Sequence, residues 1–254
     1  MSSFALKCCA VIFMLIDHSA IMLYDLRKID PNTYYLMRTL GRFAFPIYCF
    51  LLAEGFRHLR HDGAKLRRHL LLLGVLAVCS EVPFDLLAHG QYEYLSSQNV
   101  IFTLLIAFGG LWLAEGAWDR PLAGLGIAGV SVCLAYFISS DYRGVGVFLV
   151  FACALYLERS GSWGYGKRLL GMLVVMVCYY AFYCWSGANF GGPGAVWRYF
   201  LAMGWYGLPH LLLVPLLASY TGTLGYRNPV LHRAYQFFYP AHLTALCLIS
   251  HLLR

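Results

Sequence analysis

Long apolar runs separated by short loops most constrain what this 254-residue chain can fold into. The hydrocarbon core of a bilayer is about 30 Å thick, and a helix needs about 20 mostly apolar residues to cross it. Hydrophobic residues make up 60% of the chain and charged residues only 12%, a balance too apolar for a soluble protein. Because a backbone inside lipid must satisfy its hydrogen bonds internally, we expect an all-α fold, a polytopic transmembrane helical bundle.

The length and the short loops predict about nine transmembrane helices, within a range of eight to ten. No linker interrupts the chain, so residues 1–254 are expected to form a single integral-membrane domain. Two more segments, residues 26–40 and 186–195, are candidates for re-entrant or broken helices. The predicted spans are residues 5–25, 41–57, 69–88, 99–117, 121–139, 143–158, 168–186, 196–218 and 231–252.

Basic residues predict the orientation in the membrane. Lys and Arg are concentrated in residues 57–68, whereas the loop at 89–98 has none, so the positive-inside rule places residues 57–68 and the N-terminus in the cytoplasm. We therefore expect a multi-pass protein of the bacterial inner (cytoplasmic) membrane. Alternation then leaves four cations on the opposite side, against the rule. A re-entrant segment at 26–40 would relieve the conflict, as would a functional role that holds Arg38 and Arg42 inside the bundle. The four cations are Arg27, Lys28, Arg38 and Arg42.

The sequence does not predict a nucleic-acid partner, a disulfide framework or a metal site. The net charge of +7 is concentrated in loops without a basic and aromatic groove, so nucleic acid is not a predicted partner. The nine cysteines lie mostly inside the predicted spans without CxxC spacing, and we interpret them as small buried hydrophobic residues. His58 and His61 lack a third ligand at helical spacing, so no metal site is expected.

Ionisable residues inside predicted spans indicate function, because each costs about 2.5–3.5 kcal/mol at the centre of a membrane helix. A neutral imidazole can act as a general base, and we expect His18 to do so, with a carboxylate, Asp17 or Glu54, to orient it. Alternatively, Asp17 and His18 only form hydrogen bonds to neighbouring helices. The full set is Asp17, His18, Glu54, Glu81, Asp85 and His242.

Cations at one end of the predicted bundle suit phosphate. Lys7 lies eleven residues before His18, on nearly the same helix face and about 16 Å away. Arg57 and Arg60 follow Glu54, and the planar donor fork of arginine meets phosphate oxygens in pairs. A solvated run of charges that sets the topology would give the same pattern.

Acids later in the chain are candidates for binding an amine or carrying protons. Glu81 and Asp85 are four residues apart on one helix face, with Pro83 between them. Pairing with a bundle cation such as Arg42 is the alternative. Asp141 lies at a helix junction, where it could also serve as a cap, and His242 follows a proline inside the last predicted span.

Taken together, these segments resemble the TraX family of pilin N-acetylases. The resemblance rests on MLIDH at residues 14–18, GRFAFPIYCFLLAEGF at 41–56 and SEVPFD at 80–85, followed by DY at 141–142 and YPAHL at 239–243. TraX proteins are similar in turn to the membrane acyltransferase-3 group. The basic residue, ten residues and histidine of that group's first helix match Lys7 to His18, and its RxxR signature resembles Arg57 to Arg60. The resemblance covers nearly the whole chain.

The resemblance implies transfer of an acyl group from cytoplasmic acyl-CoA to an acceptor in or across the membrane, with His18 central and the cations holding the CoA. The acceptor could be a pilin N-terminus, a peptide or a glycan. We expect acetyl-CoA as the donor, an amine such as a pilin N-terminus as the acceptor, and no metal. Our own hypothesis for the mechanism adds Asp17 and Glu54 to His18 as the catalytic set, and Arg42 would hold acetyl-CoA, stabilise the oxyanion or only pair an acid. The other residues expected to hold acetyl-CoA are Lys7, Arg57 and Arg60, and those expected to contact the acceptor are Glu81, Asp85, Asp141 and His242. Arg143 departs from the expected pattern, since a less charged residue is expected after Asp141 and Tyr142.

Two other functions fit the same residues. A proton-coupled transporter or exporter would use the intramembrane acids and histidines as a relay and the glycine-rich segment near residue 190 as a broken helix. A non-catalytic assembly subunit would use them only to hold helices together, and substitutions would then lower stability and function together.

Overall fold

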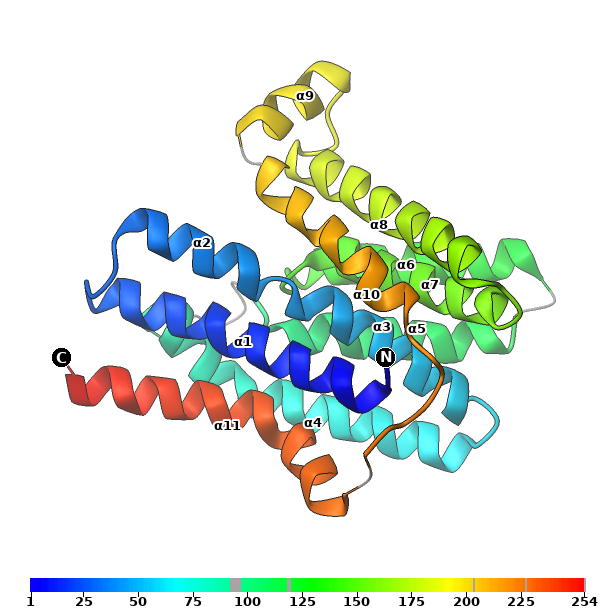
Figure 1. Ribbon diagram of the computed structural model, residues 1–254, viewed down its shortest axis with the longest axis horizontal. Coiled ribbons are helices and arrows are strands. Elements are labelled where there is room, and N and C mark those ends of the chain that lie inside the picture. The colour runs from blue at the N-terminus through cyan, green and yellow to red at the C-terminus, as the bar shows by residue number, and fades with distance from the viewer. Residues whose placement is uncertain (92–96, 118–119, 203, 227, 254) are drawn as a thin grey trace.

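Apolar helices build the part of the chain that the computed structural model describes, residues 1–91, 97–117, 120–202, 204–226 and 228–253 (Figure 1). These residues contain no strand, and the one isolated bridge joins Gln98 to Ser140. The α-helices are α1 (Ser3–Asp25), α2 (Pro31–Gly41), α3 (Ala44–Leu59), α4 (Gly63–Ala88), α5 (Val100–Glu115), α6 (Pro121–Phe137), α7 (Arg143–Ser160), α8 (Tyr165–Gly187), α9 (Pro193–Ala202), α10 (Leu213–Ala218) and α11 (Pro229–Leu253), with a 3-10 helix, η1 (Gly204–Leu212), before α10.

Polar caps fix where several helices begin. The Asp30 carboxylate accepts from the backbone amides of Asn32 and Thr33, and proline follows it at the first position of α2. Asp62 caps α4 in the same way by accepting from the Lys65 amide at 3.0 Å. Asn99 caps α5 by accepting from the Ile101 amide at 3.0 Å. These caps satisfy backbone amides in the first turns of α2, α4 and α5.

Several helices are suited to a membrane, which confirms the expected membrane protein with a helical bundle. Four segments are long and apolar enough to cross a bilayer: α1, residues 31–59 of α2 and α3, α4 and α8. A fifth would be the pair Pro193–Ala202 and Gly207–Ala218, whose helices are bent by 85°. The apolar helices α5 and α6 have only 16 and 17 residues. The expected count of about nine spans is therefore not confirmed.

The difference in count has physical causes in the chain. Within the segment 26–40, which was a candidate for a re-entrant or broken helix, the chain forms α2, which packs along α1 and leads into α3 (Figure 1). Residues 31–59 count together as one candidate span. The break predicted within 186–195 is present, because Asn189 and Phe190 adopt positive φ values of 52° and 57° between α8 and α9. Residue 203 in the predicted span 196–218, and residues 92–96 in the loop predicted to lack cations, lie outside the described residues.

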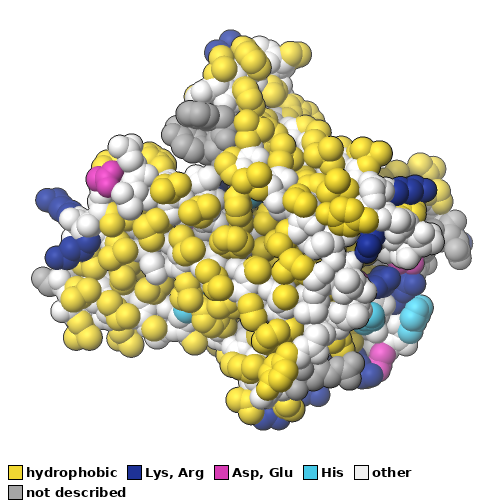
Figure 2. All heavy atoms as spheres, in the orientation of Figure 1, with side chains coloured by type: hydrophobic (Ala, Val, Ile, Leu, Met, Phe, Trp, Pro, Cys, Tyr) yellow, Lys and Arg dark blue, Asp and Glu magenta, His cyan; other side chains and the backbone are white. Residues whose placement is uncertain are grey.

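The outward faces of the helices are largely apolar, and Figure 2 shows hydrophobic side chains over most of one face. The nine cysteines are free thiols. The prediction that they are buried is wrong for four of them, which are exposed on apolar helices: Cys8, Cys79, Cys133 and Cys178. A helix in lipid does not need to bury its apolar side chains against protein, so hydrophobicity did not predict burial here.

The loops after α3 and α7, together with the neighbouring helix ends, form what we call the basic end of the bundle. Arg60 donates to Glu158 of α7 at 2.8 Å and lies 3.9 Å from Glu115 of α5. Arg168 of α8 donates to the Tyr220 carbonyl at 2.8 Å. These contacts bring distant segments to the same end, and its cations are Arg57, Arg60, Lys65, Arg67, Arg68, Arg159, Lys167 and Arg168.

Gly41 lets α1 and α2 approach closely. A Cβ added at Gly41 would lie 2.4 Å from the Cβ of Asp17 and 2.5 Å from its Cα. We expect Gly41→Ala to destabilise the protein by about 1–3 kcal/mol, because backbone cannot move aside as a flexible side chain would. Gly55→Ala in α3 is the matched control, since a Cβ there meets nothing within 4 Å. Thermal unfolding in detergent micelles measures both, and equal stabilities would contradict this prediction.

Candidate active site

Two buried histidines from opposite ends of the chain meet in the bundle. His18 of α1 and His242 of α11 join their rings through a hydrogen bond of 2.8 Å between Nδ1 of His18 and Nε2 of His242. The side chains are only 9% and 6% exposed. The Tyr239 ring packs edge-on against both, with centroid distances of 5.9 and 5.5 Å. Because α1 and α11 lie side by side, residues 224 positions apart form one unit (Figure 1).

Asp17 points to a different partner from its neighbour. Successive residues on a helix diverge by about 100°, and while His18 faces α11, Asp17 faces α2. The Asp17 carboxylate forms a largely buried ion pair with Arg38, with 2.5 Å between Oδ2 and Nη1. Arg42 and Asp141 also interact electrostatically with Asp17. Its other oxygen, Oδ1, is buried and has no hydrogen-bond partner among the described residues.

The start of α5 brings in a further acid and a tyrosine. Glu81 of α4 accepts hydrogen bonds from the backbone and side-chain amides of Asn99. Tyr239 interacts electrostatically with Asp141, Glu81 and Asp17. The first turn of a helix carries a partial positive charge, which favours carboxylates at this position.

The loop before α7 holds Asp141 against the same helix end. The Asp141 amide donates to the Gln98 carbonyl at 2.8 Å, and the Thr103 hydroxyl donates to the Asp141 carbonyl. Thr103 also contacts the Ser140 hydroxyl at 2.9 Å. Arg42 and Arg38 both interact electrostatically with the Asp141 carboxylate. Asp141 therefore contributes its side chain to the cluster in addition to ending a turn.

We call this cluster the polar centre. Six of the residues predicted from sequence belong to it: Asp17, His18, Arg42, Glu81, Asp141 and His242. Asp85 lies one turn beyond Glu81 on α4, fully buried, and interacts electrostatically with it. The structure adds three residues that the sequence reasoning did not assign to a site, Arg38, Asn99 and Tyr239. Of these three residues, Arg38 had a signal in the sequence: the predicted topology places this cation on the non-cytoplasmic side, against the positive-inside rule.

Glu54 does not lie in the polar centre. Its carboxylate accepts two hydrogen bonds from Arg57, at 3.0 and 3.1 Å, and lies 2.9 Å from the His58 ring. It also accepts from the Tyr220 hydroxyl at 3.0 Å. Burial raises the pKa of the Tyr220 phenol and the Glu54 carboxylate raises it further, so the phenol stays protonated and donates.

The distance along the bundle separates Glu54 from His18. Gly41 lies against Asp17, and Glu54 follows Gly41 by thirteen residues, which is about 20 Å at the rise of a helix. Glu54 therefore lies at the basic end. The side chain that is hydrogen-bonded to His18 is a histidine, His242, and not the expected carboxylate.

The other predicted cations lie at or toward the basic end. Lys7 places its ammonium 5.0 Å from the centre of the Tyr235 ring, about 16 Å along α1 from His18. Arg57 binds Glu54, and Arg60 binds Glu158. The chain therefore has a cationic end and a polar centre on the same helices, separated by roughly three turns.

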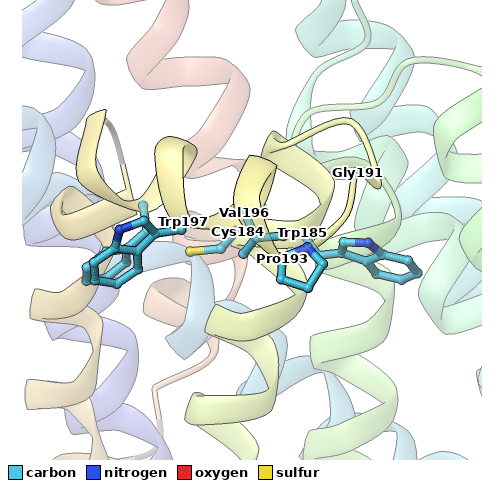
Figure 3. A pocket seen from close by; sticks show the side chains of 7 residues that line it. Cys184, Trp185, Gly191, Pro193, Val196 and Trp197 are labelled. Atoms are coloured by element: carbon cyan, nitrogen blue, oxygen red, sulfur yellow. The ribbon is translucent and has the colours of Figure 1, made fainter.

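Two hollows of the outer surface lie away from the polar centre. One is formed between α8 and α9 and is lined almost wholly by apolar groups, among them Trp185, Val196 and Trp197 (Figure 3). A second lies between α6 and α8, around Phe182 and Phe190. Neither includes a residue of the polar centre. Among the described residues, no group of three or more His, Cys, Asp or Glu side chains is placed to hold a metal ion.

Comparison with known proteins identifies the family. The chain is 28% identical over 257 residues to a protein of Dichelobacter nodosus named "Probable fimbrial assembly protein FimC, serogroup H1", with 97% of this chain and 94% of that protein covered. No solved structure matches the chain. The family model described as "TraX protein" matches residues 2–250, nearly the whole sequence. The chain therefore belongs to the TraX family.

Proposed function

We propose that this protein is an integral-membrane acyltransferase that transfers an acetyl group from acetyl-CoA to an amine acceptor, such as the N-terminus of a pilin. The observation that carries the proposal is the buried His18 ring, which is hydrogen-bonded to His242 and follows Asp17, the residue that forms the ion pair with Arg38. Membership of the TraX family and the fimbrial name of the Dichelobacter relative support a pilin-like acceptor.

The proposed reaction uses His18 as a general base. The acceptor nitrogen attacks the thioester carbonyl, a C–N bond forms, and the C–S bond breaks to release the CoA thiolate. His18 takes the proton from the attacking amine and returns it to the thiolate, so the ring is neutral again after each turnover. Arg42 is placed beside the acids of the polar centre, where its guanidinium can stabilise the oxyanion that develops on the carbonyl.

Acids of the polar centre suit the amine. An amine at neutral pH arrives largely protonated, and a carboxylate both attracts the ammonium and can accept its extra proton. Glu81 has a buried oxygen, Oε1, without a hydrogen-bond partner among the described residues, and Asp17 has another. We propose that Glu81, Asp141 and Asp85 bind the acceptor amine. Asp17 chiefly serves as the partner of Arg38, with which it already forms an ion pair.

The basic end suits the phosphates of acetyl-CoA. The positive-inside rule puts this end in the cytoplasm of a bacterial inner membrane, where the donor is available. Arg57 and Arg60 already bind Glu54 and Glu158, so phosphate oxygens would share these guanidinium groups with carboxylates. With Lys7 between the two regions, the pantetheine arm would run along α1 toward His18.

The test is acetyl transfer by the purified protein in detergent. Radiolabelled acetyl-CoA is incubated with a peptide that carries a pilin N-terminus and with the same peptide blocked at its amine. We expect label on the free amine only. A stable protein that neither binds acetyl-CoA nor labels the peptide would overturn the proposal, and proton-coupled uptake in proteoliposomes would then support the transporter function.

Arg57→Ala tests the donor site separately. We expect acetyl-CoA binding to weaken about tenfold, because a charge-assisted hydrogen bond contributes about 1.5 kcal/mol or more. Lys28→Ala, an exposed cation in the loop after α1, is the control and should bind as wild type does. Isothermal titration gives both dissociation constants. Equal affinities for the Arg57 variant and wild type would place the CoA phosphates elsewhere.

A further inference from the structure

His242 has a defined role in the polar centre that follows from the direction of its hydrogen bonds. Its Nδ1 lies 2.8 Å from the backbone carbonyl of Phe238, one turn earlier on α11. A carbonyl oxygen only accepts, so the hydrogen of a neutral His242 ring resides on Nδ1. Nε2 of His242 is then a lone pair, and it faces Nδ1 of His18 at 2.8 Å.

The same reasoning fixes the tautomer of His18. An acceptor at Nε2 of His242 requires a donor, so Nδ1 of His18 carries the hydrogen. This hydrogen bond therefore favours hydrogen on Nδ1 of His18 and leaves its Nε2 unprotonated.

Burial supports neutral rings. His18 and His242 lie against each other away from solvent, and Arg38 adds a positive charge nearby. A second cation at this buried position would be costly, because neither ring contacts a carboxylate among the described residues.

We infer that His242 is a positioning residue that holds His18 in the Nδ1–H tautomer and so presents Nε2 of His18 as the base. This inference rests on the proposed acyl transfer and deepens it. The proton is exchanged only at Nε2 of His18, which takes it from the acceptor amine and returns it to the CoA thiolate. The chain from His18 through His242 to the Phe238 carbonyl stays hydrogen-bonded throughout. The role parallels that of a carboxylate behind a catalytic histidine, here performed by a second imidazole.

Two substitutions separate positioning from packing. His242→Leu fills similar space but cannot accept a hydrogen bond, and we expect kcat to fall about 100-fold with KM nearly unchanged. His242→Gln can place Oε1 where Nε2 was, accept from His18 and restore most of the turnover. His251→Gln, an exposed histidine on the same helix, should behave as wild type. If the Leu variant stays folded and active, or the Gln variant is as slow as the Leu variant, the role is refuted.

A spectroscopic measurement tests the tautomer without any substrate. In protein labelled with 15N-histidine, the ring nitrogen shifts distinguish Nδ1–H from Nε2–H, and His18→Gln identifies the His18 signals. We expect Nδ1–H for His18 in wild type and loss of that preference in His242→Leu. An Nε2–H or doubly protonated His18 in wild type would overturn the inference. A correct tautomer without acetyl transfer would instead overturn only the proposed function.

Discussion

His18→Gln is expected to lower kcat for acetyl transfer by about 10²–10⁴-fold, the range that general-base catalysis contributes. Glutamine fills similar space and can donate to Nε2 of His242, so the contact between α1 and α11 is kept while the base is removed. Initial rates of label transfer from acetyl-CoA to the pilin peptide, across a range of donor concentrations, give kcat and KM for the variant and wild type.

Binding and stability controls make this result specific. The variant should bind acetyl-CoA as wild type does, because the proposed phosphate contacts lie at the basic end of the bundle, and even Lys7 is about 16 Å from His18 along α1. Its melting temperature in detergent should stay close to that of wild type, and His251→Gln should retain full activity. Full turnover by a folded His18→Gln protein would remove His18 from the mechanism. Loss of activity and stability together would favour the role of a non-catalytic assembly subunit.

Arg38→Met is expected to destabilise the protein by about 3 kcal/mol, the lower end of the cost of breaking a buried ion pair. The substitution leaves the Asp17 carboxylate buried without its 2.5 Å partner. Arg42 still interacts with Asp17 and limits the cost. Unfolding of purified protein in mixed micelles with increasing denaturant measures the change in the free energy of unfolding.

A double variant shows whether the pair itself is responsible. Asp17→Asn combined with Arg38→Met removes the unpaired charge, so we expect it to be more stable than Arg38→Met alone. Lys28→Met, in the exposed loop after α1, is the control and should change stability little. A double variant less stable than either single variant would show that the two residues are stabilised by separate partners.

The residue pattern predicted part of the site because ionisable side chains are rare inside predicted membrane spans and are therefore easy to recognise. An acid or histidine among apolar residues is costly, so Asp17, His18 and His242 could be selected without knowledge of contacts. The pattern did not reveal which of these side chains meet. Glu54 and Asp17 were equivalent candidates to orient His18, and the structure gives neither of them that place.

Apolar composition and short loops by themselves determined that this protein is a helical membrane protein, and the motifs of residues 14–18, 41–56 and 80–85 determined its family. Only the tertiary structure decided that His242 faces His18 and that Arg38 binds Asp17, because such pairs depend on how helices far apart in sequence pack. The number of helices that are long enough to cross a bilayer also became known only from the tertiary structure. Hydropathy measures the transfer of a segment into lipid, whereas bends and helix ends depend on caps, positive φ values and neighbouring helices.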